Sequence, residues 1–206
     1  MHSKEIMNLL LKLNNLKNLS RSGWSLAGIQ NQTAESVADH SWGTAVIALL
    51  LALLENGTGS NLNISRILTM AIIHDSPESI LSDIPSSTVL REHEQFQQVK
   101  LDLENRGFEI LFSDLSEEKI QQKLAISWQE YTSGKTKEAK IVKSADILDM
   151  LIQARSFENS GTPPYLLDSF FTTSQDILRV LGSDFAMDIF DELLKDHETM
   201  MNKTTS

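Results

Sequence analysis

The chain has 206 residues, no cysteine and a formal net charge of −10, from 18 basic and 28 acidic side chains. This length favours one compact domain, and the lack of cysteine excludes a disulfide scaffold, a thiolate zinc site and a thiol nucleophile. The acidic balance argues against binding nucleic-acid polymers or anionic membranes through bulk charge. A small phosphorylated ligand stays compatible with it, provided that a metal ion or an arginine supplies positive charge locally.

The amino-terminal segment has no features of a targeting sequence. Lys4, Glu5, Lys12 and Lys17 interrupt it, so it lacks the uncharged apolar centre of a signal peptide. The longest strongly apolar run, residues 45–54, is shorter than a bilayer span. We therefore expect a cytoplasmic protein with no membrane partner.

Apolar residues recur at helical spacing along most of the chain, and only four prolines interrupt it. Ser36, followed three residues later by Asp39, has the form of a capping box and predicts a helix to about Glu55. Ser76 and Pro77 suit the start of another helix, as N-cap and first helical residue. The remaining helices are expected over residues 3–18, 64–75, 91–105, 116–131, 135–158, 165–181 and 184–200. The predicted fold class is all-α.

Two of the five histidines stand beside aspartates in apolar surroundings. His40 lies in the first turn of the helix that follows Ser36, and His74-Asp75 ends the apolar segment 64–73. A polar pair at such a position costs free energy unless a partner satisfies it. Taken one at a time, these residues fit buried histidines and helix-end acids that the backbone satisfies, so the functional interpretation depends on the set as a whole.

A third acidic position completes the pattern. Asp146 falls on the same helical stripe as Val142 and Met150, where an acid without a countercharge is uncommon. Together with the two histidines and Asp75, it offers two imidazole nitrogens and two carboxylates. This donor mixture suits a divalent ion such as manganese, cobalt, zinc or magnesium, among which the sequence does not decide. Water in the remaining coordination positions would have a lowered pKa.

Four blocks of sequence, taken in order, resemble the 5′-deoxynucleotidase branch of the HD-domain metal-dependent phosphohydrolases. The resemblance extends from about residue 5 to about residue 160, and the blocks are residues 21–24, 35–41, 74–84 and 138–146. It implies an HD-domain helical fold in a single domain over 1–206. The metal-site core would cover about 20–160, and the carboxyl-terminal helices about 165–200.

The resemblance also implies a role for each site residue. The metal ligands would be His40, His74, Asp75 and Asp146. Glu78 would be the catalytic acid–base residue, because it follows Asp75 by three positions and can face the same site.

Three further residues would bind the substrate. Arg21 would hold the phosphate through bidentate contacts, Trp24 would form a wall for the sugar or base, and Asp83 would accept a hydrogen bond from a sugar hydroxyl. Arginine and tryptophan are adjacent in the bacterial members, whereas Ser22 and Gly23 separate them here.

The implied activity is removal of phosphate from nucleoside 5′-monophosphates, in particular the 2′-deoxy forms, by attack of a metal-bound water. The partner would be a small-molecule nucleotide and not a nucleic-acid polymer. Three alternatives stay open: an HD phosphohydrolase acting on nucleoside triphosphates, cyclic nucleotides or alarmones; a metal-binding nucleotide sensor without turnover; and a helical partner-binding domain. A homodimer is also left open, since the last two helices carry apolar faces.

Several other residues receive ordinary interpretations. The histidines His2, His93 and His197 are expected at the surface. Lys143 could reach toward the site, but a solvated helix face is expected for it. Trp42 and Trp128 are interpreted as core or dimer contacts.

Overall fold

The computed structural model describes residues 2–29, 34–85 and 94–204, and these ranges contain helices and no β-strand. The only extended pairing within them is an isolated antiparallel bridge between Ser20 and Ser36. The prediction of an all-α fold is confirmed. The division into one domain stays a prediction.

The helices follow the predicted order, with a few additions. The long helices are α1 (His2–Leu13), α3 (Val37–Gly57), α4 (Ile64–Ile73), α7 (Glu94–Phe112), α8 (Glu118–Ser133), α9 (Lys137–Asn159), α10 (Asp168–Leu181) and α11 (Asp184–Thr204). The short ones are η1 (Asn14–Asn18), α2 (Ser22–Leu26), α5 (Glu78–Leu81) and η2 (Pro164–Leu166).

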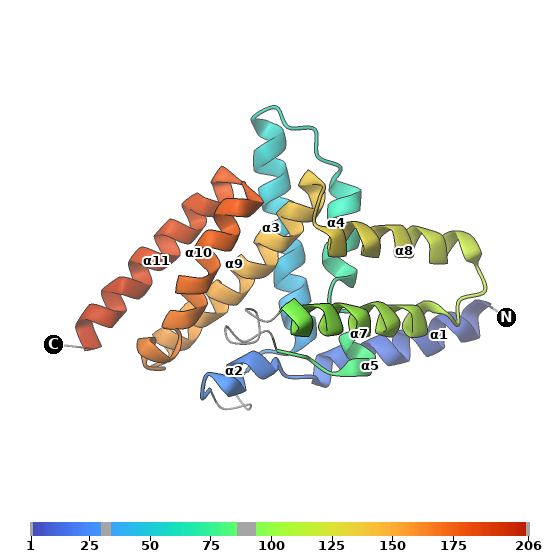
Figure 1. Ribbon diagram of the computed structural model, residues 1–206, viewed down its shortest axis with the longest axis horizontal. Coiled ribbons are helices and arrows are strands. Elements are labelled where there is room, and N and C mark those ends of the chain that lie inside the picture. The colour runs from blue at the N-terminus through green and yellow to red at the C-terminus, as the bar shows by residue number, and fades with distance from the viewer. Residues whose placement is uncertain (1, 30–33, 86–93, 205–206) are drawn as a thin grey trace.

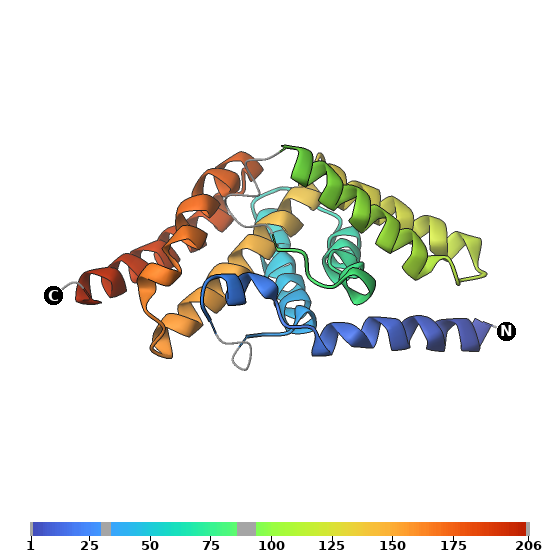
Figure 2. The same ribbon diagram turned by 60° about the horizontal axis from the view of Figure 1, so that its bottom comes forward.

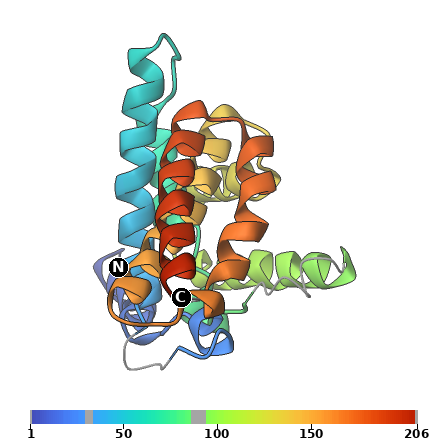
Figure 3. The ribbon, with the colours of Figure 1, turned by 90° about the vertical axis from the view of Figure 1, so that its left-hand side faces the viewer.

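The long helices α3 and α9 cross at the centre of the molecule (Figure 1). Helices α10 and α11 lie on one side of this pair, while α1, α7 and α8 lie on the other, so the two chain termini are far apart (Figure 2). Figure 3 shows α11 beside α3, with α10 next to α11. The crossing of α3, α4 and α9 brings together the segments that carry His40, His74 and Asp146.

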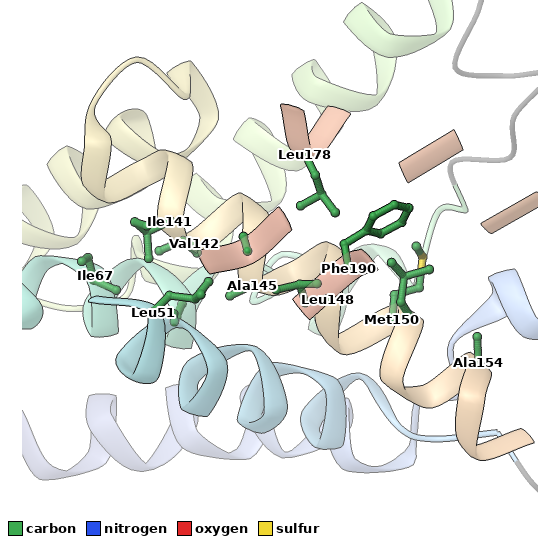
Figure 4. Close-up of a cluster of buried hydrophobic side chains, with 14 of the residues drawn as sticks. Leu51, Ile67, Ile141, Val142, Ala145, Leu148, Met150, Ala154, Leu178 and Phe190 are labelled. Atoms are coloured by element: carbon green, nitrogen blue, oxygen red, sulfur yellow. The ribbon is translucent and has the colours of Figure 1, made fainter. Parts of the chain in front are cut away.

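The main core lies along α9 (Figure 4). Helix α3 packs against α9, and the fully buried residues of this core include Ala48 and Ala52 of α3 and Ala145 of α9. Small side chains let two helix backbones approach closely, so polar groups on both helices can meet. Larger residues fill the space around this contact, among them Leu51, Ile67, Leu148, Leu178 and Phe190.

A second, smaller core lies between α1, α7 and α8. It contains Leu9, Phe108, Leu111 and Trp128, with the Trp128 ring stacked on Phe108 at 4.8 Å. The interpretation of Trp128 as a core residue is confirmed. This core holds α7 beside the end of α4, where the predicted site begins.

The predicted helix starts are right at one position and wrong at another. Ser36 accepts from the Asp39 backbone N–H while the Asp39 carboxylate accepts from the Ser36 N–H, which is the predicted capping box. Ser76 does not cap α5, because its hydroxyl donates instead to the Ile73 carbonyl. The first helix also ends earlier than predicted, since residues 14–18 tighten into a 3₁₀ turn.

Helix α3 is apolar on its outer face as well as its inner one. By length and composition alone it could cross a membrane, as no other described helix could, and it is much longer than the apolar run 45–54 recognised in the sequence. Its inner face is packed against α4 and α9. Trp42 on the outer face is 73% exposed, so its interpretation as core is wrong, and a dimer contact there stays a prediction.

Candidate metal and substrate site

His40, His74, Asp75 and Asp146 converge on one point. The two imidazole Nε2 atoms are 3.4 Å apart. Asp146 Oδ1 is 3.1 Å from His40 Nε2, and Asp75 Oδ2 is 3.2 Å from His74 Nε2 and 3.6 Å from His40 Nε2. Two nitrogens and two carboxylates from α3, α9 and the end of α4 therefore face each other.

The second ring nitrogen of each histidine fixes its orientation. His74 Nδ1 donates to the Ala71 carbonyl over 2.8 Å, and His40 Nδ1 donates to Asp149 Oδ2 over 2.7 Å. Because both acceptors lack a proton to give, each Nδ1 carries the hydrogen and each Nε2 is directed to the common point. Both rings are buried, which holds them in place.

The contact between Asp149 and His40 depends on a glycine in the middle of α3. A Cβ placed on Gly43 would lie 1.9 Å from Asp149 Oδ1, so only glycine leaves room for this carboxylate. Sequence reasoning missed both residues. The available signal was an internal helical glycine one turn after His40, together with an acid one turn after Asp146.

The cluster is strongly polarised. Burial and the Arg21 charge both lower the pKa of His40, but hydrogen bonds with Asp146 and Asp149 outweigh them and raise it to about 9. Burial acts to raise the pKa values of Asp75 and Asp146, yet the two imidazoles and Arg21 hold both well below their usual range. Carboxylates that stay ionised in a buried place are a favourable environment for a cation.

The donor set fits a divalent metal ion. Ligand atoms of His40, His74 and Asp146 all lie within 4.8 Å of one another, and Asp75 Oδ2 is beside both histidines. Imidazole and carboxylate are the donors that zinc, manganese and cobalt accept. A divalent cation would satisfy the same carboxylates that the histidine protons satisfy in its absence.

Glu78 lies next to this cluster on the short helix α5. Its Oε2 is buried and has no hydrogen-bond partner among the described residues. Burial, followed by the charges of Asp75 and Asp83, raises the pKa of Glu78 to about 10. This environment favours the protonated form of the carboxyl, which is the form that a proton donor needs.

Arg21 approaches the cluster from the loop before α2. Its Nη1 is 3.7 Å from Asp75 Oδ2, and its Nε is 3.9 Å from Glu35 Oε1. The loop is fixed to the start of α3, because the Arg21 N–H donates to the Glu35 carbonyl. Asp83 holds the next residue, with its Oδ2 accepting from both the backbone N–H and the hydroxyl of Ser22.

Trp24 packs in the core and also lines the cavity. Its ring contacts Phe157 at 5.1 Å and Phe170 at 4.9 Å, and its Nε1 donates to Glu35 Oε1 over 3.2 Å. Only 1% of the residue is exposed. The Ser22–Gly23 insertion thus lies on helix α2, which keeps Arg21 and Trp24 at the same site.

These residues surround a cavity of about 880 Å³. Arg21, His74, Asp75 and Asp146 are part of its wall. The rest of the wall combines apolar side chains of α9 and α10 with polar side chains of α7 and α8; examples are Ile147, Met150, Phe170, Gln97, Glu104 and Thr132. A cavity of this size can enclose a drug-sized or nucleotide-sized molecule.

Lys143 and Tyr131 are further cavity residues that sequence reasoning did not assign. Lys143 Nζ lies 4.4 Å from the centre of the Tyr131 ring, and the Tyr131 hydroxyl donates to Asp146 Oδ2 over 3.4 Å. The prediction of a solvated helix face for Lys143 is wrong, because the side chain lies on the cavity wall. Its position depends on α8, which the sequence of α9 does not reveal.

All three remaining histidines were predicted to lie at the surface, and the structure supports this for one of the two that it describes. His2 is exposed, as predicted, whereas His197 is only 1% exposed and contacts Glu158 through Nδ1. The surface prediction for His197 is therefore wrong. His93 lies outside the described residues.

Comparisons with known proteins identify the family to which the chain is similar. The family model described as the HD domain matches residues 13–181 of the chain. The curated 5′-deoxynucleotidase HDDC2 of Bos taurus is 30% identical over 175 residues, which cover 84% of this chain and 77% of the relative.

Solved structures give the same result for the fold. A conserved hypothetical protein from Pyrococcus furiosus superposes with a TM-score of 0.74 at 31% identity, covering 92% of this chain and 99% of that protein. An HD-domain phosphohydrolase from Listeria innocua has a TM-score of 0.73 at 19% identity, over 96% of this chain and 92% of that one. The second likeness concerns the fold alone.

Proposed function

Because the chain belongs to the HD-domain family, we propose that it is a metal-dependent phosphohydrolase that removes phosphate from nucleoside 5′-monophosphates, in particular the 2′-deoxy forms. The observation that carries this proposal is the convergence of His40, His74, Asp75 and Asp146 beside Arg21, with three of the four on the wall of a nucleotide-sized cavity. The curated relatives named 5′-deoxynucleotidase support the substrate class. Action on a free nucleotide in the cytoplasm is part of the proposal.

The four converging side chains would hold the divalent ion. When bound, such an ion supplies Lewis-acid charge at the phosphate and lowers the pKa of nearby water. The residues themselves hold this arrangement in place through Asp149 and the Ala71 carbonyl, which orient the two imidazoles.

Arg21 would bind the phosphate. Its guanidinium lies beside Asp75 and is held by Glu35, so its position is fixed before substrate arrives. A planar guanidinium can donate two parallel hydrogen bonds to phosphate oxygens, which a lysine cannot. Its charge would offset the negative charge that grows on those oxygens during reaction.

Glu78 would act as the general acid–base residue. Water attacks phosphorus, a new P–O bond forms, and the bond between phosphorus and the 5′ oxygen breaks. The leaving oxygen would take a proton from Glu78, whose pKa burial raises to about 10, and the carboxylate so formed would accept the proton that the attacking water loses. Glu78 Oε2 has no hydrogen-bond partner among the described residues, which supports a role in which its partner is the substrate.

The nucleoside would occupy the part of the cavity beyond Arg21. Trp24 and Phe170 form an aromatic corner there. Asp83 Oδ2 already accepts two hydrogen bonds from Ser22, so contact with a sugar hydroxyl would fall to its other oxygen. Substitution at Asp83 would consequently disturb the Arg21 loop as well as sugar selection.

The test is phosphate release from deoxy- and ribonucleoside 5′-monophosphates, with and without manganese, cobalt, zinc or magnesium. We expect metal-dependent release that is faster for the deoxy substrates. Nucleoside triphosphates, cyclic nucleotides and alarmones belong in the same panel, since hydrolysis of one of these alone would replace the substrate class.

A Glu78→Gln variant separates an enzyme from a sensor. The change keeps the shape and removes the acid, so we expect release to fall about 100-fold or more while metal content stays unchanged. Folded, metal-loaded wild-type protein that binds nucleotides and releases no phosphate from any of them would contradict the proposal and favour the sensor.

A further inference from the structure

We propose that Lys143 is a second phosphate-binding residue, which contacts the substrate phosphate together with Arg21. The inference rests on the proposed function for the identity of the phosphate-bearing ligand. Lys143 lines the same cavity as Arg21, His74 and Asp146.

The first argument is the way in which the ammonium is held. Lys143 Nζ lies over the Tyr131 ring at 4.4 Å, a cation–π contact. The lysine stem passes close to Gly134, where an added Cβ would lie 3.0 Å from Lys143 Cε. A long side chain confined between a ring and a backbone turn loses its freedom before the ligand binds, so little entropy is left to lose on binding.

The second argument is the position of Tyr131 between Lys143 and the metal-ligand cluster. The Tyr131 hydroxyl donates to Asp146 Oδ2, while Asp146 Oδ1 faces His40. Arg21 instead contacts Asp75. Lys143 is thus linked to the cluster through Tyr131 and Asp146, and Arg21 is linked to it through Asp75. A phosphate at the cluster presents three outer oxygens that two such cations can share.

The third argument is charge balance. Within the described part of the chain, no carboxylate oxygen lies within 4.0 Å of Lys143 Nζ, although Glu104 is a neighbour and pairs with Lys100 at 3.5 Å. Burial lowers the pKa of Lys143, and the charges of Asp146 and Glu104 counteract this shift. A half-buried ammonium on a cavity wall has lost part of its hydration, so an anionic ligand stabilises it more than it would stabilise an exposed ammonium.

The test measures binding of inorganic phosphate and of a deoxynucleoside to the manganese-loaded full-length protein by calorimetry. Lys143→Met removes the charge and keeps the length of the side chain. We expect the Kd for phosphate to rise about tenfold, with partial recovery in Lys143→Arg. The Kd for the deoxynucleoside and the bound manganese should stay within about twofold.

Lys137→Met is the matched control, because Lys137 lies on the same helix and is exposed outside the cavity. It should leave both Kd values unchanged. Three results would overturn the proposal: phosphate binding in Lys143→Met within about twofold of wild type, equal weakening of phosphate and deoxynucleoside, or no measurable phosphate binding by the wild-type protein. The second result would give Lys143 a structural role.

The proposed activity can fail without this inference. If wild-type protein releases no phosphate from any nucleotide, but Lys143→Met selectively weakens phosphate binding, then the enzyme assignment is wrong and the Lys143 assignment stands. Normal hydrolysis by the wild-type protein, together with unchanged phosphate binding in Lys143→Met, would leave the enzyme assignment standing and overturn the Lys143 assignment.

Discussion

Two buried clusters in this molecule join histidine to carboxylates. In the first, His40 and His74 each use Nδ1 to bond an acceptor of the protein and turn Nε2 to a shared point beside the cavity. In the second, His197 contacts Glu158 through Nδ1 and Asp168 through Nε2, and its ring stacks on Phe171 at 4.2 Å. Both ring nitrogens of His197 are occupied within its own cluster.

The two clusters differ in whether their buried carboxylates have hydrogen-bond or ion-pair partners. Glu158 in the second cluster is paired with both Arg155 and His197, and its side chain is fully buried. The first cluster collects several acids, and Glu78 Oε2 there is buried with no partner among the described residues. We call the cluster of His197, Glu158 and Asp168 the closed cluster and the cluster of His40 and His74 the open cluster. The closed cluster stabilises the packing of α9, α10 and α11, whereas the open cluster retains capacity for a cation and a substrate. Burial of a histidine does not by itself distinguish the two.

The largest expected effect is loss of a proposed ligand. Asp146→Ala removes the carboxylate that faces His40 Nε2 at 3.1 Å. We expect bound metal to be lost and phosphate release to fall by more than about 100-fold, because loss of a group that only orients a ligand already costs 10- to 100-fold. Metal analysis and the release assay check this. Full metal content in the variant would contradict the proposed ligand set.

A smaller effect is expected from Gly43→Ala, which breaks the open cluster without touching a proposed ligand. The added methyl collides with Asp149 and releases His40 Nδ1 from its acceptor. Metal affinity should fall about 10- to 100-fold. Gly57→Ala is the control on the same helix, since its Cβ would meet no atom within 4 Å. Equal metal affinity in both variants would show that Asp149 does not orient His40.

The closed cluster should respond in stability and leave metal affinity unchanged. Glu158→Gln leaves Arg155 and His197 without their buried carboxylate. Breaking a buried charged network costs about 3 kcal/mol of unfolding free energy. Chemical denaturation measures this, and metal titration should give the wild-type affinity. A loss of metal from this variant would abolish the distinction between the two clusters.

The smallest expected effect is the change in melting temperature on substitution of an exposed histidine. His2 is near Glu5 and Ser116 at the surface, with 66% of its side chain exposed. We expect His2→Ala to shift the melting temperature by no more than about 2 °C, because exposed pairs contribute little. Metal content and activity should not change. A larger shift would mean that the start of α1 is held more firmly than its exposure indicates.

Much of the fold was predictable because helical periodicity is a local signal. The long helices follow from apolar spacing, and the Ser36–Asp39 capping box fixed the start of α3. Helix α2 was missed, since its five residues are too few for a periodic pattern. The end of α1 was misplaced because Leu16 continues the buried stripe into the 3₁₀ turn.

The site was predictable where unusual residues lie in apolar segments, as with His74-Asp75 at the end of α4. Asp149 and Tyr131 were not predicted, and a solvated face was favoured for Lys143 over a position at the site, because the roles of all three depend on contacts between different helices. The same reason explains the wrong surface prediction for His197, whose neighbours on α11 are polar but whose ring lies under α9 and α10.

The spread of the proposed ligands along the chain couples metal supply to folding. His40 and His74 are 34 positions apart, and Asp146 is on a third helix nearer the carboxyl end. An unfolded chain cannot present these groups together, so an ion that binds them binds the native state alone. At a free concentration of 100 times its Kd, such an ion adds about 2.7 kcal/mol to the free energy of unfolding. The folded fraction of this protein would then follow the amount of free metal in its surroundings.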